Sequence, residues 1–254
     1  MNAELPLLIE VVGGVAWLTL NRPEASNALN PALVAALADA VDAIGVDEVR
    51  CVVVKASGAR FCGGGDISTF VGELDQRSAM RESAARGEAV VRSLGELKVP
   101  VIVAVHGAVA GAGLSFVLNA DVVIAARSAR FVPAYAGLGL TPDLGVSDLL
   151  PRIVGERRAA LFLLSGKPLS ADEAERWGLV SEVVDDDDLL SRATEFAEGI
   201  AAGSPFSMAA IKRLLRSSSG VTRAVSAADE AETIAAALAT DIARSRINTF
   251  LSRT

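Results

Sequence analysis

The chain has 254 residues, of which 51% are hydrophobic and 22% are charged, a composition typical of an ordered globular protein. Its 31 acidic residues outnumber its 24 basic ones, and the net charge of −7 argues against general binding to nucleic acid or anionic membranes. We therefore expect any anionic ligand to be held by local groups.

The first elements are two short strands and a helix. Residues 7–12 and 15–20 are apolar runs separated by Gly13-Gly14, a dipeptide that favours a hairpin turn. A helix is predicted to begin at Pro31, whose fixed φ suits a first turn, with Asn30 as its cap.

Two glycine-rich turns follow apolar strands and stand out from the rest of the chain. The strand at 50–55 leads into Gly63-Gly64-Gly65, and the strand at 101–105 leads into Gly111-Ala112-Gly113. Glycines let a ligand approach the backbone and allow N–H groups to point outward, which is what an oxyanion requires. Asp66 is suited to cap the helix that follows the first turn.

The remaining pattern alternates strands with helices, as in βαβ units. We expect further strands at 121–125 and 179–184, and helices at 76–97, 111–119, 188–202, 205–217 and 221–251. The irregular stretch 131–145 is long for a compact domain, and such segments are often functional. Four aspartates at 185–188 could hold a metal, but a run of this kind is typical of a solvent-facing helix cap.

Residues 99–120 contain no Asp, Glu, Lys or Arg, and this length could span a bilayer. The β-branched first half and glycine-punctuated second half instead predict a buried strand and a buried helix, so we expect no membrane segment. Cys51 and Cys62 have neither a metal-binding nor a redox spacing, and the first residues lack the basic region of a secretory signal. We therefore expect a cytoplasmic protein without a metal site.

Five motifs occur in order along the chain, at 21–29 (NRPEASNAL), 61–67 (FCGGGDI), 106–113 (HGAVAGAG), 138–143 (LGLTPD) and 150–155 (LPRIVG). Together they resemble the crotonase family, also called the enoyl-CoA hydratase/isomerase superfamily. The resemblance implies an α/β fold, a crotonase-like spiral of ββα units over residues 1–195, with a C-terminal helical trimerisation region over 196–254. A homotrimer or a dimer of trimers is therefore expected.

The same resemblance implies that the substrate is an acyl-CoA thioester, with no cofactor besides the CoA that the substrate carries. By position, the backbone N–H groups of Gly65 and Ala112 would stabilise a thioester enolate in an oxyanion hole. The positions that match CoA-binding residues of the family are Ala25, Ser26, Gly63, Asp66 and Ile67. Candidates to bind the CoA phosphates are Lys55, Arg60 and Arg253.

The chain departs from the family pattern at the residues that activate water. The two glutamates of the hydratases correspond here to Ser115 and Tyr135, and neither side chain is a useful base at neutral pH. We expect both to line the substrate pocket, where Tyr135 packs against the acyl group or donates a hydrogen bond to it. Asp143 matches an acidic residue that transfers a proton in several isomerases of the family.

The resemblance and these departures together predict an enoyl-CoA double-bond isomerase with Asp143 as the base, and with Glu73 and Glu82 as substitutes. Two alternatives are a hydratase in which another group positions the water, and a non-catalytic acyl-CoA-binding protein. A dehalogenase is less favoured because it also requires a histidine on the long helix at 76–97. The chain's one histidine, His106, follows a strand.

Overall fold

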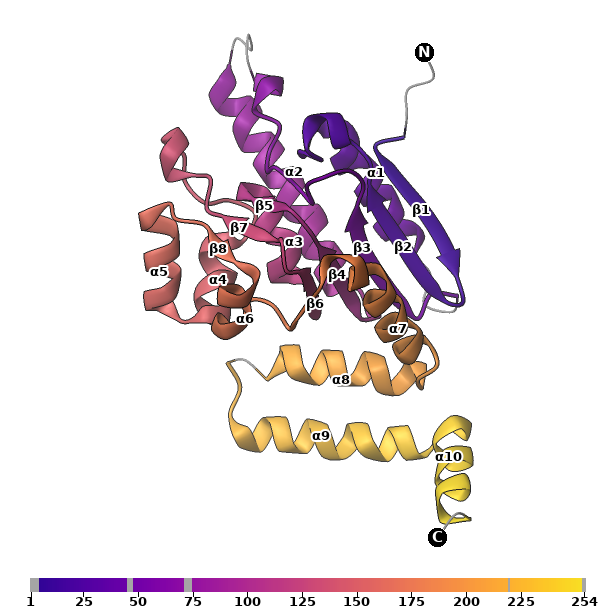
Figure 1. Cartoon of the computed structure of the whole chain (residues 1–254). Coiled ribbons are helices and arrows are strands. Elements are labelled where there is room, and N and C mark those ends of the chain that lie inside the picture. Colours follow the sequence, from indigo (N-terminus) through magenta and orange to yellow (C-terminus); the bar gives the residue numbers. More distant parts are fainter. Residues whose placement is uncertain (1–4, 45–47, 71–74, 219, 253–254) are drawn as a thin grey trace.

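A computed structural model describes residues 5–44, 48–70, 75–218 and 220–252. Its centre is a six-stranded sheet with the strand order β1-β2-β3-β4-β6-β9 (Figure 1). The first two strands, β1 (Leu7–Val12) and β2 (Val15–Leu20), are antiparallel, and all the other neighbours in this sheet are parallel. The other four strands are β3 (Cys51–Ala56), β4 (Val101–Val105), β6 (Val122–Ala126) and β9 (Glu182–Val184).

A smaller sheet lies beside the first and has the order β5-β7-β8. It consists of β5 (Ala108–Ala110), β7 (Arg130–Val132) and β8 (Leu169–Ser170). β5 follows β4 directly in the chain, so one continuous segment passes from the large sheet to the small one. The second glycine-rich turn begins where β5 ends.

Local sequence signals account for the hairpin and the first helices. Gly13 and Gly14 adopt φ values of 60° and 82°, which the hairpin turn between β1 and β2 requires. The Asn30 side chain accepts a hydrogen bond from the Leu33 amide at 2.9 Å and caps α1 (Pro31–Ala43). The long helix expected at 76–97 is α2 (Gln76–Glu96).

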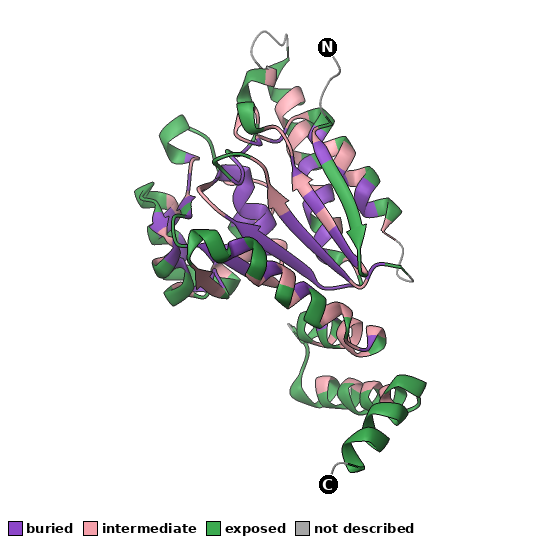
Figure 2. Cartoon of the chain, turned by 45° about the vertical axis from the view of Figure 1, so that its right-hand side comes forward, coloured by how far each residue is buried: buried purple, intermediate pink, exposed green. Residues whose placement is uncertain are grey.

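Alternation along the buried strands divides the core between the two faces of the large sheet. Side chains such as Val52 and Val103 belong to the layer that includes the buried faces of α1 and α2. Val53 and Ile102 belong to the layer under α7 (Leu189–Ala201). The central strands are therefore buried on both faces, as Figure 2 shows, which is the usual environment of parallel strands.

The uncharged stretch 99–120 contains β4, β5, a 3₁₀ turn η3 (Gly111–Gly113) and α3 (Leu114–Asn119). Its apolar side chains are buried inside the protein. Within the described residues, no helix combines the length and the apolar character needed to cross a membrane.

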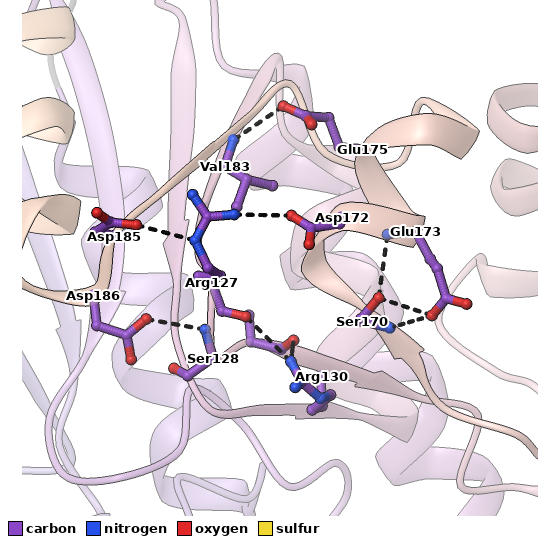
Figure 3. A network of polar contacts seen from close by, with 11 residues as sticks. Arg127, Ser128, Arg130, Ser170, Asp172, Glu173, Glu175, Val183, Asp185 and Asp186 are labelled. Carbon is purple, nitrogen blue, oxygen red and sulfur yellow. Dashed lines mark hydrogen bonds and ion pairs between the residues drawn. The ribbon is translucent and has the colours of Figure 1, made fainter.

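Three short helices follow the irregular stretch, and charged contacts tie this region to the sheet. They are α4 (Val146–Val154), α5 (Glu156–Ser165) and α6 (Ala171–Trp177). At the end of β6, the Arg127 guanidinium bonds Asp172 at 3.1 Å and Asp185 at 3.0 Å (Figure 3). The aspartate run is exposed and forms η5 (Asp186–Asp188), but the expected side-chain cap of α7 is not formed.

The chain ends in three helices that extend away from the sheets, α8 (Pro205–Ser217), α9 (Arg223–Leu238) and α10 (Asp241–Leu251) (Figure 1). The prediction of one helix over 221–251 is wrong, because Thr240 interrupts it and caps α10 by accepting from the Ala243 amide at 3.2 Å. The buried Lys212 joins α8 to the core through the Val99 carbonyl at 2.9 Å. The division expected at residue 196 lies inside α7.

Candidate active site

Backbone pairing brings the two glycine-rich turns together. Cys62 and Val109 form a parallel bridge, in which the Cys62 amide donates to the Ala108 carbonyl at 3.1 Å and the Ala110 amide donates to the Cys62 carbonyl at 2.9 Å. Gly65 and Ala112 each lie three residues beyond this pair. Because the paired segments run in the same direction, they carry Gly65 and Ala112 to the same end of the bridge.

Close backbone packing keeps the turns in contact beyond the bridge. A Cβ atom at Gly64 would lie 3.1 Å from the Ala110 carbonyl oxygen, and the φ of 107° at Gly64 is also one that favours glycine. A Cβ at Gly65, in contrast, would meet nothing within 4 Å. The first turn is therefore tight at Gly64 and open at Gly65.

The geometry of each turn leaves an amide without an obvious backbone acceptor. The neighbours of Gly65 are bonded to Leu29, since the Gly64 carbonyl accepts at 2.8 Å and the Asp66 amide donates at 2.9 Å. In a parallel bridge of this kind, the N–H of Gly65 itself points to the opposite side. Ala112 lies in the first turn of η3, where amides lack intrahelical acceptors.

Both turns line one cavity of about 260 Å³, whose remaining wall comes from α2, from the irregular stretch before α4, and from Leu29 and Val34 near the start of α1. Most of the lining is apolar. Its charged residues within the described chain are Asp66, Arg81 and Asp143. A neighbouring cavity of about 480 Å³ lies between α1 and α2 and shares Val34 and Ser83 with the first.

Asp143 and Tyr135 lie close together in the wall of the smaller cavity. Burial raises the pKa of Asp143 above its ordinary value, and the neighbouring Tyr135 hydroxyl opposes this rise by favouring the carboxylate. Burial, followed by the negative charge of Asp143, raises the pKa of Tyr135. Tyr135 therefore stays protonated at neutral pH, while Asp143 is the carboxyl group of the pair that can exchange a proton.

A comparison with known families shows to which family the chain belongs. A model described as enoyl-CoA hydratase/isomerase matches residues 10–253. The chain belongs to this family. Its members act on acyl-CoA thioesters.

Curated relatives include both isomerases and hydratases of acyl-CoA. The 1,2-epoxyphenylacetyl-CoA isomerase of Escherichia coli strain K12 is 39% identical over 216 residues, which cover 83% of this chain and 82% of that protein. The 2,3-dehydroadipyl-CoA hydratase of the same strain is 34% identical over 239 residues, covering 94% of this chain and 92% of that protein. The family is thus shared by enzymes of two reaction types.

Solved structures confirm the expected α/β crotonase fold. A crystal structure of an enoyl-CoA hydratase from Mycobacterium smegmatis is similar to this chain with a TM-score of 0.92 and 33% sequence identity. The similarity covers 98% of this chain and 97% of that one. The spiral core and the C-terminal helices are therefore both part of the shared fold.

The structure places the predicted CoA-binding residues in two groups. Gly63, Asp66 and Ile67 line the smaller cavity. Ala25 and Ser26 are not among the described residues that line it, but the Ser26 carbonyl accepts a hydrogen bond from the Gly63 amide at 2.8 Å. Their contacts with CoA stay a prediction.

Asp66 holds the first glycine-rich turn in place. The Ser68 hydroxyl and then the Arg22 guanidinium lower the pKa of Asp66, and the Arg22–Asp66 ion pair measures 3.0 Å. The helix expected after this residue is a short 3₁₀ turn, η2 (Ile67–Phe70). The buried Asn27 supports the same region, because its amide group donates to the carbonyls of Ser57 and Arg60 at 2.9 and 2.8 Å.

Ser115 is not among the described residues that line the cavity, although we expected it there together with Tyr135. It is fully buried in α3, and its hydroxyl donates to the Ala112 carbonyl, one helical turn back. This local bond turns the side chain back onto its own helix. Ser115 thus contacts Ala112, the residue whose amide is predicted to serve in the oxyanion hole.

Other candidate residues also lie away from Asp143. Glu82 lines the larger cavity and forms an exposed ion pair with Arg86. His106 bonds the Gly58 carbonyl through Nε2 at 2.8 Å, as a structural histidine does. Glu73 and Arg253 lie outside the described residues.

Two of the cations proposed for the CoA phosphates, Lys55 and Arg60, line neither cavity. The Lys55 ammonium stacks 5.4 Å from the Trp17 ring, and Arg60 donates to the Ser26 hydroxyl at 2.8 Å. Arg81 on α2, in contrast, lines the smaller cavity. Sequence reasoning missed it because exposed arginines are common on helix faces.

A contact between α2 and the Asp143 turn could not be inferred from the sequence. Leu144 has a φ of 47°, unusual for a residue with a branched side chain. A Cβ at Gly87, inside α2, would lie only 3.2 Å from Leu144 Cδ2. The glycine therefore makes room for Leu144, and their packing supports the turn that carries Asp143.

Proposed function

We propose that this protein is an acyl-CoA double-bond isomerase that uses one carboxylate, Asp143, and two backbone amides. The proposal is carried by one observation, the presence of Asp143 in the same cavity wall as Gly65 and Ala112. The residues at the two hydratase glutamate positions, Ser115 and Tyr135, provide no carboxylate. A proton can thus be transferred by one group, but the pair that activates water is missing.

In the proposed reaction, the thioester oxygen of a 3-enoyl-CoA accepts hydrogen bonds from the Gly65 and Ala112 amides. Asp143 removes a proton from the α carbon, the electron pair moves to form a dienolate, and the charge collects on the thioester oxygen. The protonated Asp143 then returns the proton to the γ carbon, giving the 2-enoyl-CoA. Atoms and charge balance without a metal or a redox cofactor.

The contribution of each group to the reaction rate can be given as an order of magnitude. General-base catalysis contributes about 10²- to 10⁴-fold. An oxyanion-hole donor contributes about 10²- to 10³-fold to kcat. The raised pKa of Asp143 also favours the base, since a carboxylate with a higher pKa is the stronger proton acceptor.

The test compares a 3-enoyl-CoA with crotonyl-CoA as substrates. Isomerisation makes the conjugated enoyl absorbance appear from the first substrate, whereas hydration makes it disappear from the second. Asp143→Asn should lower isomerisation at least a hundredfold while acyl-CoA binding is retained. Rapid hydration of crotonyl-CoA without isomerisation would favour the hydratase. If the wild-type protein showed no turnover, a non-catalytic binding protein would be favoured. If Asp143→Asn kept the wild-type rate of turnover, another residue would be the base.

We further propose that the three C-terminal helices mediate assembly as a homotrimer or a dimer of trimers. α9 and α10 contain no buried residue, as the colours of Figure 2 show. α9 exposes apolar side chains such as Ile234 and Leu238. A partner subunit would remove this surface from water. Light scattering coupled to size exclusion would test the assembly, and a monomer would contradict it.

The thiols suit a reducing compartment, and we propose the cytosol. Both cysteines are free and buried. Burial raises the pKa of Cys62 to about 11 and that of Cys51 to about 12, so both remain protonated and have no part in the proposed reaction. Fractionation of cells that express the protein would test the location.

A further inference from the structure

Two buried polar atoms in the cavity wall have no partner. Tyr135 is only 6% exposed, and its hydroxyl lies near the Asp143 carboxyl group but meets hydrogen-bond geometry with no described residue. Asp143 Oδ1 is likewise shielded from solvent and unbonded. Burying one such atom without a partner is unfavourable, and here two occur side by side. A ligand that supplies the missing partner would account for both.

The cavity wall around the two oxygen atoms is mostly apolar. Apolar side chains from α2 and from the stretch before α4 form most of the lining, including Ala84, Leu138, Leu140 and Leu144. An acyl chain made only of carbon and hydrogen would pack against these groups. It would offer no partner to the Tyr135 hydroxyl or to Asp143 Oδ1, although both atoms are shielded from solvent.

The hydrogen-bonding capacities of the two atoms define the missing group. Tyr135 is protonated and has an O–H to donate, while an ionised Asp143 can only accept. A hydroxyl group accepts one hydrogen bond and donates another. One hydroxyl placed between the two side chains would therefore satisfy both of them.

We propose that the acyl group of the substrate carries an oxygen atom, and that a hydroxyl fits best by accepting from Tyr135 and donating to Asp143 Oδ1. The inference rests on the proposed function, because it places the acyl group in this cavity. The substrate class is then a hydroxylated acyl-CoA rather than a plain fatty acyl-CoA. The second carboxylate oxygen of Asp143 is left for the proton transfer.

A simpler arrangement would satisfy the same atoms without a ligand. A small rotation could let the Tyr135 hydroxyl donate directly to Asp143, and its task would then be to stabilise the carboxylate. In that case Tyr135→Phe would raise the pKa of Asp143 with every substrate alike. The two arrangements therefore differ in whether the hydroxyl of Tyr135 distinguishes between ligands.

The experiment measures binding, so that it does not depend on turnover. Isothermal titration would compare saturated ligands in matched pairs, 6-hydroxyhexanoyl-CoA with hexanoyl-CoA, and 3- or 4-hydroxyphenylacetyl-CoA with phenylacetyl-CoA. At least one hydroxylated ligand should bind at least tenfold tighter than its partner. Tyr135→Phe should reduce this preference below threefold and leave binding of the deoxygenated partner within twofold of wild type.

A matched control removes a hydroxyl from another part of the same wall. Ser83→Ala should keep the full preference, since Ser83 lies on α2 and is shared with the larger cavity. Tyr135 is the chain's single tyrosine, so a carbon-13 label at tyrosine Cζ reports on it alone. Its chemical shift should move more with the hydroxylated ligand than with the deoxygenated one.

Equal binding within every pair would overturn the inference, as would a Tyr135→Phe variant that weakens both members of a pair alike. Isomerisation of a 3-enoyl-CoA that depends on Asp143, combined with equal binding, would leave the proposed function standing and reject only the hydroxylated substrate. If no acyl-CoA bound at all, both proposals would fall together.

Discussion

Substituting alanine for Gly113 should push apart the two turns that contain the amides of the proposed oxyanion hole. A Cβ at this position would lie 2.9 Å from both the Cβ and the carbonyl oxygen of Cys62, and 3.2 Å from its Sγ. That same carbonyl accepts the hydrogen bond from the Ala110 amide that links the turns. The added methyl group therefore acts on the link itself, and a backbone carbonyl cannot rotate away as a flexible side chain can.

The expected magnitude follows from these contacts. Overpacking a well-packed core costs about 1–3 kcal/mol in the free energy of unfolding, and two contacts closer than 3.0 Å place Gly113→Ala in the upper half of that range. A shift of one amide away from the thioester oxygen should lower kcat by about 10²- to 10³-fold. Urea denaturation and the isomerisation rate of a 3-enoyl-CoA would measure the two effects.

Gly137→Ala is the matched control. A Cβ at Gly137 would meet nothing within 4 Å. Its stability should therefore change by less than about 0.5 kcal/mol and its kcat should not change. If Gly113→Ala lost stability but kept kcat within threefold of wild type, alignment of the amides would not depend on the contact between the turns.

Three further changes test the charged and polar groups. Tyr135→Phe removes a buried hydroxyl that makes no geometric hydrogen bond. In the Asp143→Asn background, where there is no carboxylate for the hydroxyl to stabilise, urea denaturation should therefore show a gain of about 1 kcal/mol, whereas a loss would mean that the hydroxyl is bonded. Because the pKa of Asp143 is raised in the folded state, its contribution to stability falls as pH rises from 3.8 through that raised pKa. Asp143→Asn should thus be more stable than wild type at neutral pH and lose this advantage in acid. The kcat/KM of the wild-type enzyme should fall as pH drops through the raised pKa of Asp143. A difference in stability that does not depend on pH would contradict the assignment. Lys212→Ala removes a buried cation between the core and α8 and should lower the free energy of unfolding by about 1–3 kcal/mol, measured by thermal or urea unfolding. The control Arg244→Ala removes an exposed ion pair and should cost less than about 0.5 kcal/mol. Equal losses would show that burial of Lys212 does not matter.

Local rules allowed much of the fold to be predicted from the sequence. The hairpin at Gly13-Gly14 and the helix start at Asn30 depend on residues that are neighbours in the chain. The same applies to the glycine-rich turns, because their composition by itself favours exposed amides. The helix break at Thr240 was missed because the alanine-rich composition continues across it, and a single cap residue is a weak signal against a long helical pattern.

Only the tertiary structure decided how the site is assembled. The pairing of Cys62 with Val109 joins segments far apart in the chain, and its register cannot be inferred from either segment alone. The same limit applies to Tyr135 and Asp143, which line one cavity, and to Leu144, which packs on Gly87 of α2. The amino-acid sequence determines which groups can donate or accept hydrogen bonds and where the backbone can turn. Which of them meet depends on long-range packing, since one residue of slip in a pairing would turn each amide to the other side.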